Sequence, residues 1–300
     1  MKTIDEIFPL IHTYRDLREA RFSDATIQSL VYRGELARIR RGVYVYPSQV
    51  AELKKWEHPL LHVVGYFKSV PRTVFSHQSA AMLNSLSLIS LPQRIHVYCR
   101  PNSRGSTPGI VKHVKLKPTT ETRLTRCGAV TTDIATTVID CCCVLSFREA
   151  VVLADSALRM QLIEIETLRT KMLEYQGHHR KAVARVARSM SNKSESPGET
   201  LTRLLLDEMG VSYHEQVWIS LGGRMYRADF YLPDFSVYVE YDGLIKYTSF
   251  GPTDQAVMHE RQREKDFLNS GERIFRVTWN EVFKNPGLFK NQLSRYLASL

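Results

Sequence analysis

Three carboxylates stand among apolar, strand-forming residues in the C-terminal third of the chain. In residues 227–243, RADFYLPDFSVYVEYDG, Asp229, Glu240 and Asp242 are surrounded by Phe, Tyr, Leu and Val. A carboxylate in such a run is costly to bury unless a positive group meets it. The segment therefore predicts either a bound metal ion or ion pairs with nearby cations.

The strand pattern also predicts how these carboxylates are arranged. If Pro233-Asp234 are the two central residues of a hairpin turn, Asp229 pairs with Tyr238. Glu240 and Asp242 then share the face of Asp229, because side chains alternate with a period of two along a strand. Asp229 and Glu240 become diagonal neighbours, roughly 7–8 Å apart at Cα. Both carboxylates would then reach one cation.

The chemistry expected of such a pair is metal-assisted hydrolysis. Mg²⁺, for which Mn²⁺ can substitute, takes one or two carboxylates plus water and phosphate. Held by Asp229 and Glu240, with Asp242 as a further candidate ligand, it would activate water against a phosphodiester. Lys246, four residues beyond Asp242, would orient that water or stabilise the developing charge.

These residues resemble the PD-(D/E)XK nuclease superfamily, in the form related to very-short-patch-repair (Vsr-like) endonucleases. The resemblance rests on Asp229, a strand turn, Glu240-Tyr241-Asp242-Gly243 and Lys246-Tyr247, and it covers about residues 196–300. It implies a restriction-endonuclease-like α/β domain in which Asp229 and Glu240 bind metal and a lysine serves the nucleophile. This chain has Asp242 where the superfamily usually has lysine, which makes Lys246 the nearest candidate.

Two further residues of this region are candidates for the same site. Glu199 begins a helix expected at 197–209, and the resemblance implies an acidic residue near the metal there. Ser196-Pro197-Gly198-Glu199 also has the pattern of a capping box, so capping is a second role for Glu199. Arg263, on a helix expected at 253–270, is a candidate for phosphate contact, although most charges of that helix are expected on a solvated face.

A second set of residues, near the N-terminus, is suited to binding DNA. RFSDATIQSLVYRGEL predicts a helix that is capped by Ser23, ends at Gly34 and buries Ile27, Leu30 and Val31. LARIRRGVYVYP predicts a strand, a tight turn and a strand. Helices followed by a basic hairpin are typical of a winged helix-turn-helix. The candidate DNA contacts are Thr26, Gln28, Ser29, Arg33, Arg38, Arg40 and Arg41. The alternative is a protein-contact domain with solvated arginines.

The N-terminal region also resembles AbiEi-type antitoxins, the antitoxin half of type IV toxin–antitoxin systems. The resemblance is carried by LARIRRGVYVYP, SHQSAA, RIHVYCR, VTTDIATTVIDC and ADSALR, and covers about residues 5–175. It implies a DNA-binding repressor of its own operon with a cognate toxin protein as partner.

Charge is distributed unevenly along the chain. Residues 1–193 carry 29 Lys and Arg against 16 Asp and Glu, a net of +13, whereas residues 194–300 carry 12 against 15. This asymmetry favours nucleic acid as the partner of the first part, with an acidic protein as the alternative. The same part has no predicted catalytic set, because its histidines are scattered in sequence: His58, His62, His77, His96 and His113.

The elements together predict a multidomain α+β protein of three domains. These are a winged helix-turn-helix at 1–50, a basic, mixed α/β, AbiEi-like middle domain at 51–193, and a nuclease-like α/β domain at 194–300. No run approaches the roughly 18 apolar residues of a membrane span. The five cysteines have no pairing pattern and the N-terminus does not resemble a signal peptide, so a cytoplasmic protein is expected.

The combined expectation is a DNA-binding protein with a Mg²⁺-dependent endonuclease domain, acting in prokaryotic defence or in a toxin–antitoxin system. One alternative is a non-enzymatic AbiEi-like antitoxin and transcriptional repressor whose nuclease-like domain is inactive. Another is a nucleotidyltransferase-associated partner that acts through protein contacts.

Overall fold

The computed structural model describes residues 3–99, 107–114, 121–243 and 254–300, with backbone only for 254–260. These residues form a mixed α+β protein with several sheets. The chain divides into an N-terminal unit, residues 1–153 and 166–187, and a C-terminal unit, residues 154–165 and 188–300. None of the helices in the described ranges is long and apolar enough to cross a membrane.

The elements up to residue 189 are short. Their helices are α1 (Ile4–Ile7), η1 (Phe8–Leu10), α2 (Tyr14–Glu19), α3 (Asp24–Tyr32), α4 (Pro47–Val50), α5 (His58–Ser69), α6 (His77–Leu83), α7 (Ile134–Cys142), α8 (Phe147–Arg159), α9 (Ile165–Leu173) and α10 (Arg180–Ser189). Their strands are β1 (Ile11–Thr13), β2 (Ala37–Arg40), β3 (Val43–Val45), β4 (Val74–Phe75), β5 (Ile95–Cys99), β6 (Ile110–Val114), β7 (Thr122–Leu124) and β8 (Val130–Thr132).

The first three strands form an antiparallel sheet in the order β1-β3-β2. The β2–β3 turn closes through Gly42, whose φ of 71° lies in the region that glycine adopts without strain. The Ser23 hydroxyl accepts a hydrogen bond from the Thr26 N–H at 3.1 Å, which confirms the expected cap of α3. Val31 is 38% exposed, so its expected place on the buried face is wrong; the buried apolar residues of α3 are Ile27 and Leu30.

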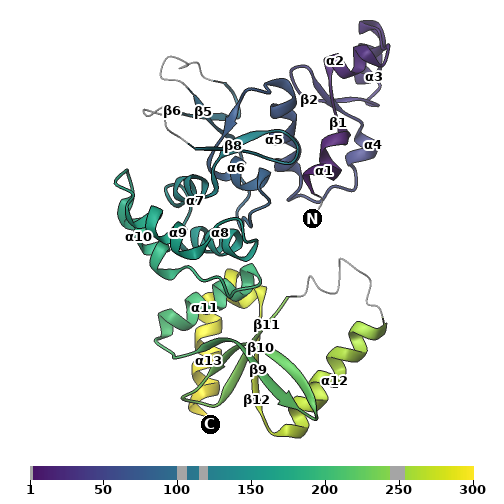
Figure 1. Ribbon diagram of the computed structural model, residues 1–300. Coiled ribbons are helices and arrows are strands. Elements are labelled where there is room, and N and C mark those ends of the chain that lie inside the picture. The colour runs from purple at the N-terminus through teal and green to yellow at the C-terminus, as the bar shows by residue number, and fades with distance from the viewer. Residues whose placement is uncertain (1–2, 100–106, 115–120, 244–253) are drawn as a thin grey trace. The chain divides into compact units, whose positions relative to one another are not determined.

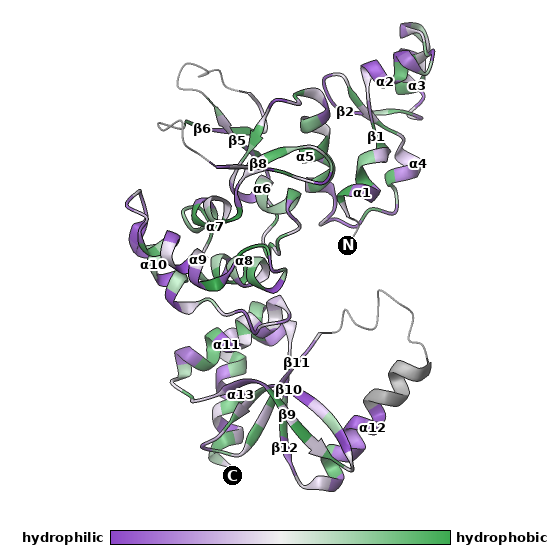
Figure 2. Ribbon diagram, viewed as in Figure 1, coloured by the Kyte–Doolittle hydropathy of each residue, from purple (hydrophilic) through white to green (hydrophobic). Residues whose placement is uncertain are grey.

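A second sheet has the order β6-β5-β4-β8-β7 and shares a core with the first. Val64 of α5, Ile11 of β1 and Phe75 of β4 are fully buried in one apolar cluster. In Figure 2, α5 is largely hydrophobic, as its position between the two sheets requires. Residues 3–50 are therefore stabilised by apolar contacts with the region that follows them.

The C-terminal unit alternates helix and strand in the order expected from its sequence. Its elements are α11 (Pro197–Met209), β9 (His214–Leu221), β10 (Arg224–Leu232), β11 (Val237–Asp242), α12 (Asp254–Ser270), β12 (Arg273–Thr278), the π-helical turn η3 (Asn280–Lys284) and α13 (Pro286–Ala298). Strands β9, β10 and β11 form an antiparallel meander, and β12 pairs with β11 in parallel. Figure 1 shows α11 and α13 on one side of this sheet and α12 on the other.

Helix α11 packs closely on β11 through a glycine. The Tyr241 ring lies where a Cβ atom on Gly198 would be, so only glycine permits this approach. The Ser196 hydroxyl caps the helix by accepting from the Glu199 N–H at 3.2 Å. These contacts fix the first turn of α11, and with it Glu199, beside the end of β11.

Candidate functional site

The β10–β11 hairpin brings Asp229 and Glu240 together more directly than expected. The observed pairs are Phe230 with Val239 and Tyr231 with Tyr238, so the register sets Asp229 opposite Glu240. The expected pairing of Asp229 with Tyr238 is wrong, because four residues, 233–236, connect the strands instead of two. An even change in loop length keeps both carboxylates on one face, as direct rather than diagonal neighbours.

Glu199 adds a third carboxylate to this pair. It is 7% exposed, and burial followed by the charge of Asp229 raises its pKa to about 7. Its Oε2 accepts hydrogen bonds from the Glu195 N–H at 2.7 Å and from Nε2 of Gln216 at 3.0 Å. The carboxylate reaches the N–H of Glu195, not that of Ser196, so the expected capping box is half formed. Glu199 thus stabilises the start of α11 and lies close to Asp229.

Asp229 is held from the backbone of the neighbouring strand. The Tyr241 N–H donates to its Oδ2 at 2.7 Å. Burial, Asp242 and Glu199 together raise the pKa of the Tyr241 phenol to about 12. The end of β11 therefore concentrates negative charge around one tyrosine.

Glu240 has arginine partners. Nη2 of Arg263 donates to its Oε1, and Nε of Arg276 lies 3.9 Å from its Oε2. The ion-pair alternative would join Asp229 and Glu240 to Arg224, Arg227 or Lys246. Arg224 and Arg227 instead bind Asp266 and Glu195, and Lys246 is not among the described residues. Arg263 is thus joined to a carboxylate of the site, and its Nε is buried without a hydrogen-bond partner among the described residues.

The remaining catalytic candidates lie at the end of β11. Asp242 is its last residue, partly exposed, and pairs in register with Thr278 of β12. Lys246 lies outside the described residues. The structure therefore brings together Glu199, Asp229, Glu240 and Arg263 around the end of the central strands.

The fit of these residues to Mg²⁺ rests on their donor chemistry. Asp229 and Glu199 offer oxygen ligands from two elements, and their repulsion is the type that a divalent cation relieves. Glu240 would join them only by exchanging Arg263 for the metal. The pair suits a hard cation held by one or two carboxylates, with water and phosphate completing its coordination.

The candidate DNA contacts of the N-terminal unit separate into two groups. Thr26, Gln28 and Ser29 lie exposed on α3, whereas Arg33, at its end, binds Glu35 with 3.0 Å between Nε and Oε1. Of the hairpin arginines, Arg38 and Arg41 are exposed. Arg40 is different: its guanidinium carbon lies 4.3 Å from the centre of the Tyr66 ring, and burial lowers its pKa.

Tyr32 of α3 extends the polar face of the helix. Its side chain is 94% exposed beside Gln28 and Ser29 on the helix surface. Because the Tyr32 ring is so exposed on α3, it is available for contact with a binding partner. The sequence also predicts this position, since it places Tyr32 on the helix face opposite the apolar residues Ile27 and Leu30.

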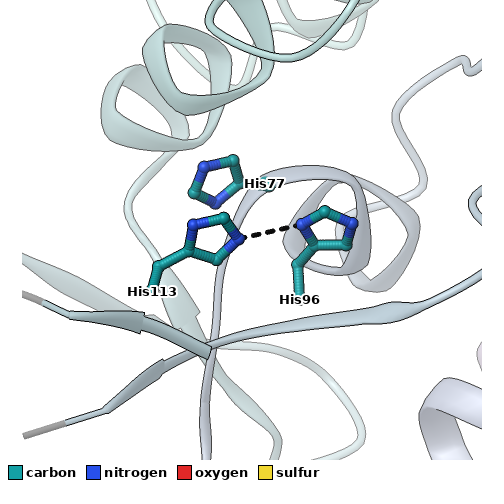
Figure 3. A group of neighbouring side chains, drawn as sticks. All are labelled: His77, His96 and His113. Atoms are coloured by element: carbon teal, nitrogen blue, oxygen red, sulfur yellow. Dashed lines mark hydrogen bonds between the residues drawn. The ribbon is translucent and has the colours of Figure 1, made fainter. Parts of the chain in front are cut away.

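Sequence spacing failed to identify one cluster of candidate metal-binding side chains. His77, His96 and His113, which lie apart in the chain, meet in the N-terminal unit (Figure 3). In the part of the chain that the structure describes, they form the one group of three or more His, Cys, Asp or Glu whose ligand atoms lie within 4.8 Å of one another. Burial, followed by the neighbouring histidines, lowers the pKa of His77 to about 3, and burial with the charges of His113 and Arg94 lowers that of His96 to about 4.

Comparison with known proteins supplies no family for the chain. No protein-family model matches it, and no curated protein matches its sequence. Among solved structures, the RV2827C protein from Mycobacterium tuberculosis aligns with 67% of this chain and 78% of its own, at 15% identity and a TM-score of 0.40. A likeness at this level carries no argument about function.

Proposed function

We propose that this chain is a cytoplasmic DNA-binding protein whose C-terminal unit hydrolyses phosphodiester bonds with the help of Mg²⁺. The observation that supports this most is the buried Glu199 close to the partly exposed Asp229, where burial and the charge of Asp229 raise the pKa of Glu199 to about 7. Such strongly perturbed carboxylates concentrate at functional sites. The order of elements, α11, three antiparallel strands, α12 and a parallel strand, agrees with a PD-(D/E)XK-type core.

The side chains have distinct tasks in this proposal. Asp229 and Glu199 hold the cation, and the Tyr241 N–H keeps the Asp229 carboxylate oriented. Mg²⁺ bound there would supply an activated water and neutralise charge on the phosphate. Arg263 would contact a phosphate oxygen in place of Glu240, and Glu240 would then be available as a further ligand. Lys246 serves the attacking water, as the family resemblance implies, and Asp242 completes the acidic cluster.

The N-terminal unit would dock the protein on DNA. The sheet order β1-β3-β2, with α2 and α3 ahead of the β2–β3 hairpin, supports a winged helix-turn-helix. In that arrangement α3 enters the major groove with Thr26, Gln28 and Ser29, and exposed Arg38 and Arg41 contact phosphates. The resemblance to AbiEi-type antitoxins agrees with this role and adds a cognate toxin as protein partner.

Plasmid cleavage tests the enzymatic part of the proposal. Purified full-length protein is incubated with supercoiled plasmid in Mg²⁺, in Mn²⁺ and in EDTA. Metal-dependent nicking is expected, and Asp229→Asn or Glu199→Gln should reduce it at least a hundredfold because each removes a charged ligand. Asp234→Asn is the matched control, since Asp234 is an exposed carboxylate in the turn of the same hairpin.

A second function, transcriptional repression without cleavage, is favoured by one observation. The Glu240 carboxylate is already joined to Arg263 and approached by Arg276, which is how a structural ion-pair network looks. This alternative predicts tight binding to the chain's own promoter with no nicking of plasmid, single-stranded DNA or RNA in any metal. That combination of results would replace the nuclease proposal.

A further inference from the structure

Three histidines converge from three elements of the N-terminal unit. His77 is the first residue of α6, His96 lies in β5 and His113 lies in β6. Strands β5 and β6 are parallel and pair Tyr98 with His113, so His96, two residues before Tyr98, shares the face of His113. Figure 3 shows the three rings gathered in one place, with His77 over His113 and His96 beside it.

The rings contact one another through nitrogens and through their faces. Nδ1 of His96 lies 3.0 Å from Nε2 of His113, the dashed line in Figure 3. The rings of His77 and His113 stack with centroids 3.7 Å apart. One nitrogen from each histidine falls within 4.8 Å of the other two. One nitrogen of each ring is thus near enough to the other two for a single metal ion to be held, once the stacked rings of His77 and His113 turn so that their in-plane lone pairs meet.

His77 is held toward this space at a conformational cost. Its φ of 49° lies in the left-handed region, which is uncommon for a residue with a side chain. Such strain persists where surrounding contacts over-determine it, and it concentrates at functional sites. His77 is also buried, so the strain does not arise from a loose surface turn.

The outer nitrogen of His77 faces polar groups of the type that orient metal-binding histidines. Its Nδ1 lies 3.0 Å from the Ser76 hydroxyl and 3.7 Å from Oδ2 of Asp140. Asp140 in turn accepts from the Tyr98 hydroxyl at 2.7 and 2.8 Å. With Nδ1 bonded to the Ser76 hydroxyl and the Asp140 carboxylate nearby, the lone pair of the other nitrogen, Nε2, is left for a metal.

We propose that His77, His96 and His113 form a binding site for Zn²⁺. The ion would take the position of the proton between His96 and His113 and receive His77 as its third ligand. Imidazole nitrogens suit Zn²⁺ and its neighbours in the transition series, whereas Mg²⁺ requires oxygen ligands. Three histidines also leave one coordination position of a tetrahedral Zn²⁺ open to water or a partner's ligand. This site is independent of the carboxylates in the C-terminal unit.

Cobalt titration tests the proposal, because Co²⁺ replaces Zn²⁺ and absorbs visible light when it is tetrahedral. Full-length protein is freed of metal with a chelator and titrated with Co²⁺ at pH 7.5. One equivalent is expected to bind with visible absorption, to be displaced by Zn²⁺ and to be unaffected by excess Mg²⁺. Absence of binding by the wild-type chain would overturn the proposal, whatever the variants do.

Variants then assign the ligands. His96→Gln and His113→Phe should each lower the affinity for Co²⁺ at least a hundredfold, whereas His62→Gln, at an exposed histidine of α5, should leave it unchanged. Asp140→Asn, which alters only a positioning group, should lower it about tenfold to a hundredfold. Far-ultraviolet circular dichroism checks that each variant is folded.

A measurement on the wild-type chain tests the ligand assignment even if the variants fail to fold. Zn²⁺ should shift the ring signals of three histidines in histidine-selective nuclear magnetic resonance, and leave those of the other seven in place. Shifts spread over other histidines, or equal affinity in wild type and His96→Gln, would show that the cluster is a hydrogen-bonded and stacked core only.

Discussion

Two effects act in opposite directions on the ionisation of Glu199. As an acceptor for the Glu195 N–H and Gln216 it favours the charged form, yet burial and Asp229 favour the neutral form, and the second effect is larger. The sequence could suggest both capping and metal binding for this residue. How far the pKa of Glu199 rises depends on how closely β10 approaches α11. That distance cannot be read from the spacing of residues in the sequence.

The raised pKa of Glu199 makes the stability of the C-terminal unit depend on pH. Its folded pKa of about 7 lies above the ordinary 4.5, so folding gains stability from the proton below pH 4.5 and loses it as pH rises through 7. The loss is on the order of 3 kcal/mol. Glu199→Gln, which stays neutral, should match wild type near pH 4.5 and exceed it in stability at pH 8.

Urea unfolding at several pH values measures this effect. Trp218 and Trp279 report on the C-terminal unit, and a Trp56→Phe background removes the tryptophan of the N-terminal unit. Asp234→Asn should keep the wild-type pH dependence. An identical pH profile for wild type and Glu199→Gln would show that Glu199 is ionised and well solvated.

Arg203 provides a second residue-scale prediction. Its Nη2 lies 2.8 Å from Oδ2 of Asp155, and both side chains are at most 5% exposed. Arg203→Leu leaves the Asp155 charge buried with less compensation and should lower the free energy of unfolding by about 3–5 kcal/mol. Lys290→Ala, which removes the more exposed pair with Glu208, should cost less than about 1 kcal/mol. Equal costs in urea unfolding would contradict this account.

Among the elements, the contact between α11 and β11 controls the geometry of the candidate site. Gly198 and Gly287 both follow a proline at the start of a helix, but only Gly198 meets another side chain, the Tyr241 ring. Gly198→Ala should force α11 away from β11 and lower the free energy of unfolding by about 1–3 kcal/mol. Gly287→Ala, where the added methyl group meets nothing within 4 Å, is the matched control and should change it by less than about 0.5 kcal/mol.

A double-mutant cycle shows whether overlap with the Tyr241 ring is what makes Gly198→Ala destabilising. In a Tyr241→Leu background, Gly198→Ala should cost less than it does in wild type, because the smaller side chain removes the overlap. Additive costs in urea unfolding would mean that glycine is required for another reason.

Much of the element pattern could be predicted from local sequence signals. The helix expected at 197–209 is α11, capped by Ser196, and the helix expected at 253–270 is α12. The β10–β11 register could not be predicted in this way, because Pro233-Asp234 indicates a turn without fixing the number of residues in it. The histidine cluster could not be predicted either, because parallel pairing of β5 with β6 joins residues that have no fixed spacing in sequence.

At the scale of the whole molecule, the asymmetry of charge is the property that bears most on partners. The net of +13 over residues 1–193 contrasts with −3 over the rest, where 12 Lys and Arg face 15 Asp and Glu. A phosphate backbone would therefore be attracted to the N-terminal part and repelled by the acidic cluster of the C-terminal unit, unless a cation is bound there. The proposed Mg²⁺ would lower this barrier.

This electrostatic arrangement predicts a salt dependence that specific residues control. Binding of a labelled DNA duplex, followed by fluorescence anisotropy, should weaken linearly on a logarithmic scale as salt increases. Arg38→Ala and Arg41→Ala, at exposed hairpin arginines, should each reduce the slope by about 1, the value for one phosphate contact. Arg295→Ala, exposed on α13 of the C-terminal unit, is the control.

Residues of α3 should behave differently from those arginines. Gln28→Ala and Tyr32→Ala should weaken binding to the preferred sequence while leaving the salt slope unchanged, because neither side chain carries charge. Selection of bound duplexes from a random pool identifies that sequence. If the hairpin variants keep the full slope and the α3 variants keep the sequence preference, the N-terminal unit is not the surface that docks on DNA, and its arginines serve a protein contact instead.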